Sequence, residues 1–539
     1  MRVLGKKPAI VGPRLRGPAS ARRPAPALPE RVRVAPPAEV EGRAWRHLYI
    51  PLKLRVALTV LAGLLWVGFS LWLSRRWISS LGHDLTPAGA VVLIAGIALI
   101  PGYLNIQLLS SILLDQPPSL RFDVAFPEVV LLIAAYNEQE SIAETLDCAL
   151  RTDYPGRFQV VVADDGSSDR TREIVAGYAA RNERVRLLEA DHGGKAEALN
   201  AALGTVNAPL VATIDADTLL MPYSLKRAVA RLAASPADTV AVAGSVLVRN
   251  SRQNLLTRAQ EWDYFLGIAS VKRAQALLQG TLVAQGAFSV YDTTALKLAG
   301  GWPNRIGEDI VLTWRMLAQG GRSVFEPTAV AFTEAPADWR AFARQRRRWA
   351  RGMIEGLRDH GFGLLKSLNF YSHSVAGNFV FPFLDACFTL GFIPGVALAA
   401  TGNFAIVGPM TLLVLPLNAV LGGVMFMHQR HVFSTVNLRV RKNGIGLLFY
   451  FFCYQFVMSP ISLAGYVLEA ARAAALVATP ILRYTSGVAD FWFSVCAGTA
   501  SLAVAALSAA KGTWVVAIVW SALAAGFALR ARYGWRRRR

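Results

Sequence analysis

The chain has 539 residues, of which 53% are hydrophobic and only 17% charged, and this composition excludes an ordinary soluble enzyme. Its formal net charge of +21 is explained by Lys and Arg on the cytoplasmic flanks of membrane spans. The N-terminal basic residues lie in a Pro-rich segment without interleaved aromatic residues, so the sequence predicts no nucleic-acid partner. The four cysteines are scattered, which disfavours a zinc or disulfide framework.

Several apolar runs are each long enough to cross roughly 30 Å of hydrocarbon as a helix. The predicted spans are Leu54–Leu73, Ala88–Leu109, Val375–Ala400, Phe404–Met427, Ile445–Leu468, Phe491–Ala509 and Thr513–Leu529. The predicted division of the chain is a disordered basic cytoplasmic arm (1–50), two transmembrane helices (51–115), a catalytic domain (116–352), an interfacial helix (353–374), C-terminal transmembrane helices (375–532) and a basic cytoplasmic tail (533–539).

The number of crossings is left open by the charge rule. Seven simple spans would place Arg536–Arg539 outside, although Lys and Arg favour the cytoplasmic side. Either Ile445–Tyr484, which contains Pro460 and Pro480, forms two passes or a re-entrant pair, or one late span is not a crossing. Asp385 lies within the third span, and an acid there should face the protein interior or a wet pore, with a helix-packing role as the alternative.

Between about residues 127 and 352, short apolar runs alternate with amphipathic ones. The predicted strands are Val129–Ala135, Val160–Ala163, Val185–Leu188 and Leu210–Ile214, and the predicted helices are Glu138–Leu150, Asp169–Ala180 and Lys195–Leu203. This alternation predicts an α/β domain with a Rossmann-like, mostly parallel sheet and right-handed crossovers. Ligands of such sheets bind at the carboxyl ends of the strands.

Two acids follow the last of these strands. Asp215 and Asp217 are separated by one residue, and carboxylates so spaced on a turn can hold Mg²⁺ or Mn²⁺ against a substrate diphosphate. A capped turn is the alternative, since Asp is common before helices. Asp165 follows the second predicted strand, Val160–Ala163, where its carboxylate can accept hydrogen bonds from a ribose or a uracil ring. Lys195 follows two glycines and can place an ammonium on a diphosphate, although the segment is not a P-loop.

Glu308 and Asp309 come just before an amphipathic run. Inverting sugar transfer needs a carboxylate to take the proton of the acceptor hydroxyl, and Asp309 is our choice for this base. The alternative is a pair of acids that stabilise a helix N-terminus. Further along, Arg348 is predicted to contact the diphosphate leaving group and Trp349 a sugar face. A basic helix at the membrane surface is the alternative, and we expect it to hold for Arg346 or Arg347.

Five segments in order carry a family resemblance: Asp-Asp-Gly-Ser, Gly-Lys-Ala-x-Ala-Leu-Asn (Gly194 to Asn200), Asp-Ala-Asp-Thr, Glu-Asp and Gln-x-x-Arg-Trp. They resemble the processive family 2 inverting glycosyltransferases, which include cellulose, hyaluronan, chitin-oligosaccharide and poly-N-acetylglucosamine synthases. The resemblance covers about residues 127–352. It implies a GT-A catalytic fold on the cytoplasmic face, a UDP-sugar donor, a divalent metal and a polymer channel through the spans.

The resemblance also assigns roles to individual residues. It implies that Asp165 contacts the uridine, Lys195 the diphosphate, and Asp215 and Asp217 the donor and the metal. Asp309 would be the catalytic base, with Glu308 beside it in the substrate site. The remaining implied substrate contacts are Gln345, Arg348 and Trp349, for the leaving group and the terminal acceptor sugar, and Gly286, for the acceptor-site turn.

Departures from the family pattern bear on the sugar. Gly307 stands where the family often has Thr, and this weakens a cellulose assignment. The phrase Phe325-Glu326-Pro327 to Thr333-Glu334-Ala335-Pro336 looks most like that of poly-N-acetylglucosamine synthases. We therefore expect polymerisation of UDP-N-acetylglucosamine into an exported, biofilm-type β-linked polysaccharide.

The expected partners are the UDP-sugar, the growing polysaccharide, membrane lipid and an accessory export subunit. The expected location is the inner (plasma) membrane, with several crossings and a cytoplasmic catalytic domain. The alternatives are a non-processive transferase acting on a lipid or glycan, a β-glucan synthase using UDP-glucose, and a transporter or receptor with a degenerate catalytic domain.

Overall fold

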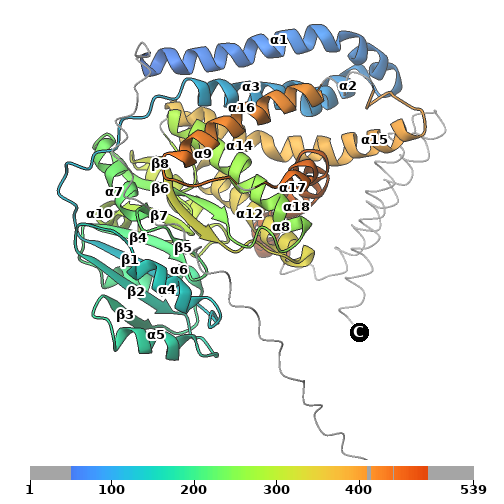
Figure 1. Ribbon diagram of the computed structural model, residues 1–539. Helices are drawn as coiled ribbons and strands as arrows, with labels where there is room; N and C mark the ends of the chain where they lie inside the picture. Colours follow the sequence, from blue (N-terminus) through green and yellow to red (C-terminus); the bar gives the residue numbers. More distant parts are fainter. Residues whose placement is uncertain (1–49, 279, 409–413, 441, 483–539) are drawn as a thin grey trace, which may run out of the picture.

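An eight-stranded mixed sheet lies at the centre of the region between the apolar helices (Figure 1). The computed structural model describes residues 50–278, 280–408, 414–440 and 442–482. The strands are β1 (Val129–Ala135), β2 (Phe158–Asp164), β3 (Val185–Glu189), β4 (Leu210–Asp215), β5 (Leu219–Leu220), β6 (Thr239–Val248), β7 (Phe288–Asp292) and β8 (Arg322–Thr333). Their order is β3-β2-β1-β4-β7-β6-β8-β5.

The sheet has two halves of different character. Strands β3, β2, β1 and β4 are parallel, as the alternation of strands and helices predicts. Strand β7 is antiparallel to both β4 and β6, β6 and β8 are parallel, and the short β5 is antiparallel to β8. The predicted α/β class with a mostly parallel GT-A-type sheet between apolar helices is confirmed.

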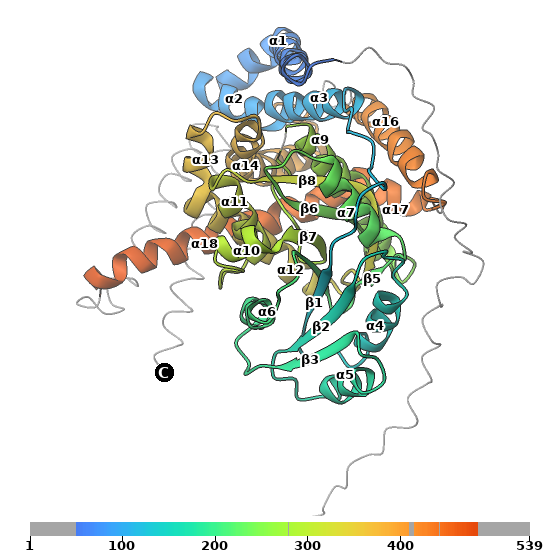
Figure 2. The same cartoon turned by 90° about the vertical axis from the view of Figure 1, so that its left-hand side faces the viewer.

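Helices cover both faces of the sheet (Figure 2). The helices between β1 and the end of this region are α4 (Ile142–Leu150), α5 (Thr171–Ala179), α6 (Lys195–Gly204), α7 (Ser224–Ala234), α8 (Leu255–Trp262), α9 (Ala269–Leu277), α10 (Thr293–Leu298), α11 (Glu308–Ala318), α12 (Trp339–Gly356) and α13 (Phe362–Lys366), with π-helical turns η2 (Asp263–Ile268) and η3 (Leu357–Gly361). Of these, α12, α13 and η3 pack on other helices rather than on the sheet.

Two predicted helix starts are displaced by local side-chain bonds. Helix α4 begins at Ile142 rather than Glu138, because Asn137 has a φ of 55° and the Glu138 N–H donates to Thr171 Oγ1. Helix α5 begins at Thr171, because the Asp169 carboxylate accepts hydrogen bonds from the Thr171 N–H and hydroxyl.

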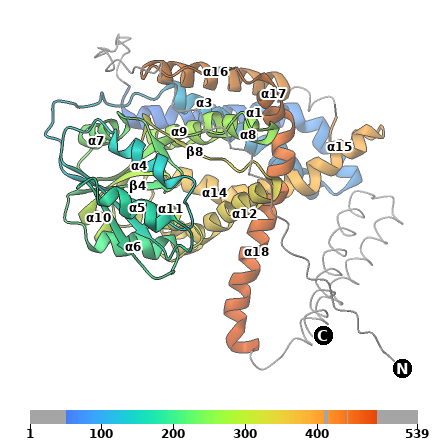
Figure 3. The same ribbon diagram turned by 60° about the horizontal axis from the view of Figure 1, so that its bottom comes forward.

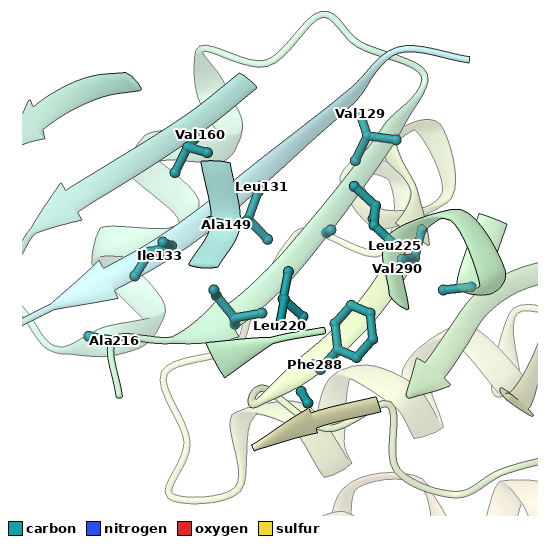
Figure 4. Close-up of a cluster of buried hydrophobic side chains, with 14 of the residues drawn as sticks. Val129, Leu131, Ile133, Ala149, Val160, Ala216, Leu220, Leu225, Phe288 and Val290 are labelled. Atoms are coloured by element: carbon teal, nitrogen blue, oxygen red, sulfur yellow. The ribbon is translucent and has the colours of Figure 1, made fainter. Parts of the chain in front are cut away.

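Strand β1 shows how the core holds the sheet. Its residues Val129, Leu131 and Ile133 pack on the face covered by α4, α5 and α7, together with Phe288 (Figure 4). Val130 and Leu132 pack on the opposite face, under α6, α10 and α11. Successive strand residues point to opposite faces, so a strand buried on both faces is apolar throughout. Each such side chain contributes roughly 1.5–3 kcal/mol by its burial.

Within the described residues, four helices are long and apolar enough to cross a membrane: Leu52–His83, Pro87–Leu113, Phe370–Ala400 and Gly444–Arg472. They are built from α1 (Leu52–Asp84), α2 (Pro87–Ile94), η1 (Ala95–Leu99), α3 (Ile100–Leu113), α14 (Phe370–Cys387), η4 (Phe388–Phe392), α15 (Ile393–Ala400), α17 (Gly444–Phe449), η6 (Tyr450–Tyr454) and α18 (Gln455–Leu482). They correspond to the first, second, third and fifth predicted spans.

The other predicted spans fare differently. Residues 404–408 are not helical, so a single helix over Phe404–Met427 is wrong. Helix α16 (Val414–Ser434) instead packs Leu421 and Met425 against Trp262 and Phe265 of the catalytic domain. The two last predicted spans, the N-terminal arm up to residue 49 and the basic tail lie outside the described residues.

The helical segment that begins at residue 444 bears on the number of membrane crossings. Residues Gly444 to Leu482 form one continuous helical segment, so two passes or a re-entrant pair over this region are wrong. Pro460 lies inside α18 without ending it, since membrane helices tolerate proline. Figure 3 shows α18 running past α12 and α14. Asp385 on α14 accepts hydrogen bonds from Ser459 and Tyr466 on α18, which is the helix-packing alternative for this acid.

Candidate active site

The strand register brings the first acids to one edge of the sheet. Ala134 of β1 is paired with Asp215 of β4, and Ala135 is paired with Asp164 of β2. The N–H of Asp165 donates to the carbonyl of Ala135 at 2.8 Å. The segments after β2 and β4 therefore flank the carboxyl end of β1, as predicted from their positions in the sequence.

Strand β7 adds a loop that sequence alone does not place. It runs antiparallel to β4 with Phe288 opposite Ile214, so the preceding Gly286-Ala287 turn lies beside Asp215. A Cβ on Gly286 would be 2.6 Å from Lys195 Nζ and 3.8 Å from Asp215 Oδ1. The absence of a side chain at Gly286 is therefore what gives the Lys195 ammonium its room.

Lys195 joins two parts of the site. It is the first residue of α6, and its Nζ lies 2.5 Å from Asp215 Oδ1 and 3.4 Å from Glu308 Oε1 at the start of α11. Burial alone would lower the pKa of Lys195, but the carboxylates of Asp215 and Glu308 raise it above its usual value. Burial raises the pKa of Glu308, and the Lys195 charge opposes this shift. Lys195 is therefore a permanent cation in the centre of the acids.

Asp217 lies on the turn after β4, next to the end of β8. Its Oδ1 accepts a hydrogen bond from Thr333 Oγ1 at 3.1 Å. Burial, followed by repulsion from Asp215, raises the pKa of Asp217 to about 6. Two carboxylates that repel each other on one turn fit a hard divalent cation, which takes carboxylate oxygens together with substrate phosphates. Among the described residues, no group of three or more acids, His or Cys could hold a metal, so the diphosphate would have to complete the coordination.

Asp309 is held beside the same turn. It is the second residue of α11, and its Oδ2 accepts the N–H of Gly286 at 3.3 Å. Its Oδ1 accepts the N–H of Ile310 at 2.8 Å. Gly286, which donates to Asp309, also lies beside Lys195 and Asp215. The structure thus places Asp309 next to the group formed by Lys195, Asp215 and Glu308.

Asp165 is occupied by its own loop. The carboxylate is 3% exposed and accepts hydrogen bonds from the N–H groups of Gly193 and Gly194 at 2.9 and 3.0 Å. His192 Nδ1 lies 3.0 Å from its Oδ2, and the His192 ring stacks on Tyr136 at 4.3 Å. Asp165 therefore fixes the loop that precedes Lys195, and its contact with a uridine stays a prediction.

Helix α12 carries Gln345, Arg348 and Trp349. Residues 345, 348, 349 and 352 are spaced to lie along one stripe of the helix. At Gly352 this stripe meets the start of α11, because a Cβ on Gly352 would be 2.7 Å from the Cα of Gly307. The Glu355 carboxylate of α12 also accepts the N–H of Ile306 at 2.8 Å. The stripe therefore ends where Glu308 and Asp309 begin.

The three predicted residues differ in their surroundings. Arg348 is exposed and has no hydrogen-bond or ion-pair partner within the part of the chain that the structure describes. Gln345 Oε1 is buried and likewise has no partner among these residues. Trp349 is half-buried, with its ring 6.3 Å from that of Tyr264. A surface position is expected for Arg346 or Arg347, and Arg347 is the exposed one of the two. Arg346 is 2% exposed and lies under Trp349.

Sequence reasoning missed several charged groups at the site. Glu138 follows β1, and burial, with a smaller effect from Asp215, raises its pKa. The rule that found Asp165, a polar residue after a strand, could have found Glu138 as well. Lys272 of α9 is buried and donates to the Val283 carbonyl and to Gln285, just before Gly286. No spacing in the sequence indicates that this lysine lies behind the turn.

Comparison with known proteins finds similar sequences for the central part of the chain. Residues 127–352 match the model of the glycosyltransferase-like family 2. A poly-beta-1,6-N-acetyl-D-glucosamine synthase of Staphylococcus aureus is 29% identical over 261 residues, which cover 48% of this chain and 62% of the relative. An N-acetylglucosaminyltransferase of Bradyrhizobium diazoefficiens is 32% identical over 243 residues, covering 42% of this chain and 49% of the relative. The chain thus spans less than two thirds of the curated relatives it matches.

Among solved structures, a mannosyltransferase from Pyrobaculum calidifontis, in complex with GDP-Man and Mn²⁺, aligns with a TM-score of 0.43 at 20% identity. The alignment covers 75% of this chain and all of the other.

Proposed function

We propose that this chain, whose residues 127–352 form a family 2 glycosyltransferase domain, transfers N-acetylglucosamine from UDP-N-acetylglucosamine to the end of a growing β-linked polysaccharide. The observation that carries this proposal is the convergence of four separate segments on Lys195. Its ammonium lies between Asp215 and Glu308, and against the Gly286 turn that donates to Asp309.

The proposed reaction inverts the anomeric carbon in one displacement. Asp309 takes the proton of an acceptor hydroxyl while that oxygen bonds to the anomeric carbon. The bond between this carbon and the phosphate oxygen breaks, and UDP leaves with the bonding electrons. Lys195 and Arg348 are positive groups for the charge that develops on the diphosphate. Trp349 provides a flat face for the terminal acceptor sugar.

A divalent cation fits the turn after β4. Asp215 and Asp217 would hold Mg²⁺ or Mn²⁺, which supplies charge neutralisation for a diphosphate when bound. Burial, followed by repulsion from Asp215, raises the pKa of Asp217, and a divalent cation on this turn would offset both effects. Thr333 fixes the orientation of Asp217 through its hydroxyl.

We also propose that the enzyme retains the growing polymer and that the polymer is exported across the membrane. The four candidate spans flank the catalytic domain on both sides in sequence, and the Staphylococcus aureus relative is named as a polysaccharide synthase. We propose that the domain faces the cytoplasm of the inner membrane, where UDP-sugars are made, and that an accessory export subunit takes over the product. The positive charges of Arg430 near the end of α16, and of Arg439 and Lys442 after it, agree with a cytoplasmic side.

The test is a donor screen with product sizing. Purified full-length protein in lipid nanodiscs is incubated with Mn²⁺ and labelled UDP-N-acetylglucosamine, UDP-glucose or UDP-N-acetylgalactosamine, and UDP release and product length are measured. We expect long, acid-labile product from UDP-N-acetylglucosamine alone. Short, lipid-extractable product would overturn processivity but not transfer. Preferred use of UDP-glucose would overturn the donor assignment, and absence of UDP release with every donor would overturn the proposed activity.

A further inference from the structure

A buried arginine lies directly beneath the side chain that we assign to the acceptor sugar. The guanidinium carbon of Arg346 is 4.1 Å from the centre of the Trp349 ring. Arg346 is 2% exposed, whereas Arg347 and Arg348 on the same helix are exposed. A basic residue of a surface helix would normally extend its charge into water, so this burial needs a physical reason.

The guanidinium is held by an acid from another element. Arg346 Nη2 forms an ion pair of 2.8 Å with Asp263 Oδ2, the first residue of the π-helical turn η2. Tyr454 Oη donates to the same Asp263 oxygen at 2.9 Å. Tyr454 is the last residue of η6, within the span Gly444–Arg472. A chain of contacts therefore runs from the Trp349 ring through Arg346 and Asp263 to a membrane helix.

Aromatic rings enclose this chain of contacts. The Arg346 guanidinium also lies 5.2 Å from the Phe342 ring and 5.7 Å from the Tyr264 ring. Such contacts with a desolvated cation are favourable and directional. A planar guanidinium stacked on an indole fixes the tilt of the ring, which a lysine ammonium in the same place would not do.

Helices α12 and α18 are packed closely enough to move together. A Cβ on Gly465 of α18 would lie 2.8 Å from Ala350 Cβ and 2.9 Å from the Arg347 carbonyl. One turn further along, Arg351 of α12 forms an ion pair of 3.0 Å with Glu469 of α18. The Arg351–Glu469 ion pair joins the same two helices and does not involve the Trp349 ring, so it provides a matched control.

We propose that Arg346 is a positioning residue, which sets the plane of Trp349 for the acceptor sugar and couples it, through Asp263 and Tyr454, to the membrane helix. This inference rests on the proposed role of Trp349 in acceptor binding. It assigns Arg346, the second residue of the Gln-Arg-Arg-Arg-Trp segment, a function in positioning the end of the growing polymer. Loss of the coupling loosens the acceptor, whereas Lys195 and Asp215 of the donor site lie on other elements and keep their positions.

The experiment compares Arg346→Lys, Tyr454→Phe and the control Arg351→Gln in nanodiscs. The KM for a short N-acetylglucosamine oligomer, the KM for UDP-N-acetylglucosamine, the product length and the unfolding temperature are measured for each. We expect Arg346→Lys to raise the oligomer KM about tenfold and to shorten the product, with the donor KM unchanged. Tyr454→Phe, which removes one hydroxyl, should raise the oligomer KM and shorten the product to a smaller extent. Arg351→Gln should change neither the oligomer KM nor the product length.

The Trp349→Ala variant tests the proposed role of Trp349 in acceptor binding separately from the proposed positioning role of Arg346. If it raises the oligomer KM and Arg346→Lys has no further effect in that background, the coupling is supported. If Trp349→Ala acts but Arg346→Lys and Tyr454→Phe leave the oligomer KM at the wild-type value, or raise the donor KM equally, the positioning role is overturned and the role of Trp349 stands. If Trp349→Ala leaves the oligomer KM unchanged, both are overturned. Should Arg346→Lys fail to fold, Tyr454→Phe alone decides by the same criteria.

Discussion

Substitution of Gly286 by Ala would disturb the central cation without removing any charge. The new Cβ would lie 2.6 Å from Lys195 Nζ, whereas non-bonded carbon contacts are normally about 3.5 Å or more. The ammonium would have to move by about 1 Å. Its neighbour Asp215 Oδ1 would be 3.8 Å from the Cβ, which is an ordinary contact. Gly286 does not have a positive φ, so the backbone accepts Ala.

The expected effect is large on activity and small on stability. A displacement of about 1 Å in a catalytic group can cost about a hundredfold in rate, or about 2.7 kcal/mol. The atom that must move is the free end of a flexible side chain, so the unfolding temperature should change little. We therefore expect kcat/KM for sugar transfer to fall about a hundredfold.

The assay is UDP release by purified protein in nanodiscs, with the unfolding temperature measured in parallel. Gly204→Ala is the matched control, because Gly204 ends the helix that Lys195 begins and no atom lies within 4 Å of its added Cβ. This control should retain wild-type kcat/KM. Wild-type kcat/KM in a folded Gly286→Ala protein would refute the reasoning that the position of the ammonium limits transfer.

Asp309→Asn should lower sugar transfer by at least about a hundredfold and leave UDP binding, measured calorimetrically, unchanged; retained turnover would refute the base assignment. Asp217→Asn should weaken the apparent affinity for Mn²⁺ at least about tenfold, whereas an unchanged Mn²⁺ titration would exclude it as a ligand. Burial lowers the pKa of Lys272 to about 7, so the unfolded chain binds more protons than the folded one from there up to 10.5, and stability rises with pH in this window. Lys272→Met should flatten that rise, at most about 1.4 kcal/mol per pH unit, in unfolding temperatures measured at several pH values. The same slope in both proteins would contradict the lowered pKa.

The sequence predicts the half of the sheet in which strands and helices alternate along the chain. Strands β1 to β4 alternate with helices, and their apolar β-branched runs give both the elements and their parallel pairing. The acids Asp165 and Asp215 follow from the same rule, since each lies at the carboxyl end of a strand that pairs with β1. The pairing of β7 with β4 joins residues far apart in the chain and in an antiparallel sense, which periodicity does not indicate.

The partners of individual side chains were the least predictable part. Arg346, Arg347 and Arg348 are chemically identical in the sequence, yet one is buried under Trp349 and two are exposed. Their environments differ because Asp263, contributed by another segment, offers a buried counter-charge to one of them. Such a difference depends on tertiary packing. The sequence has no periodicity at this position that would reveal which arginine is buried.

The contact between Gly307 and Gly352 has a consequence for how far apart Trp349 and Asp309, the proposed acceptor and base residues, can lie. Since two backbones touch there, the helix bearing Trp349 stands as near to the segment bearing Asp309 as a polypeptide permits. A methyl group at either position would push these walls apart and enlarge the space for the incoming residue of the polymer. Gly352→Ala and Gly307→Ala therefore offer a way to admit bulkier, substituted sugars, with the bare glycine pair defining the narrowest aperture that the scaffold can provide.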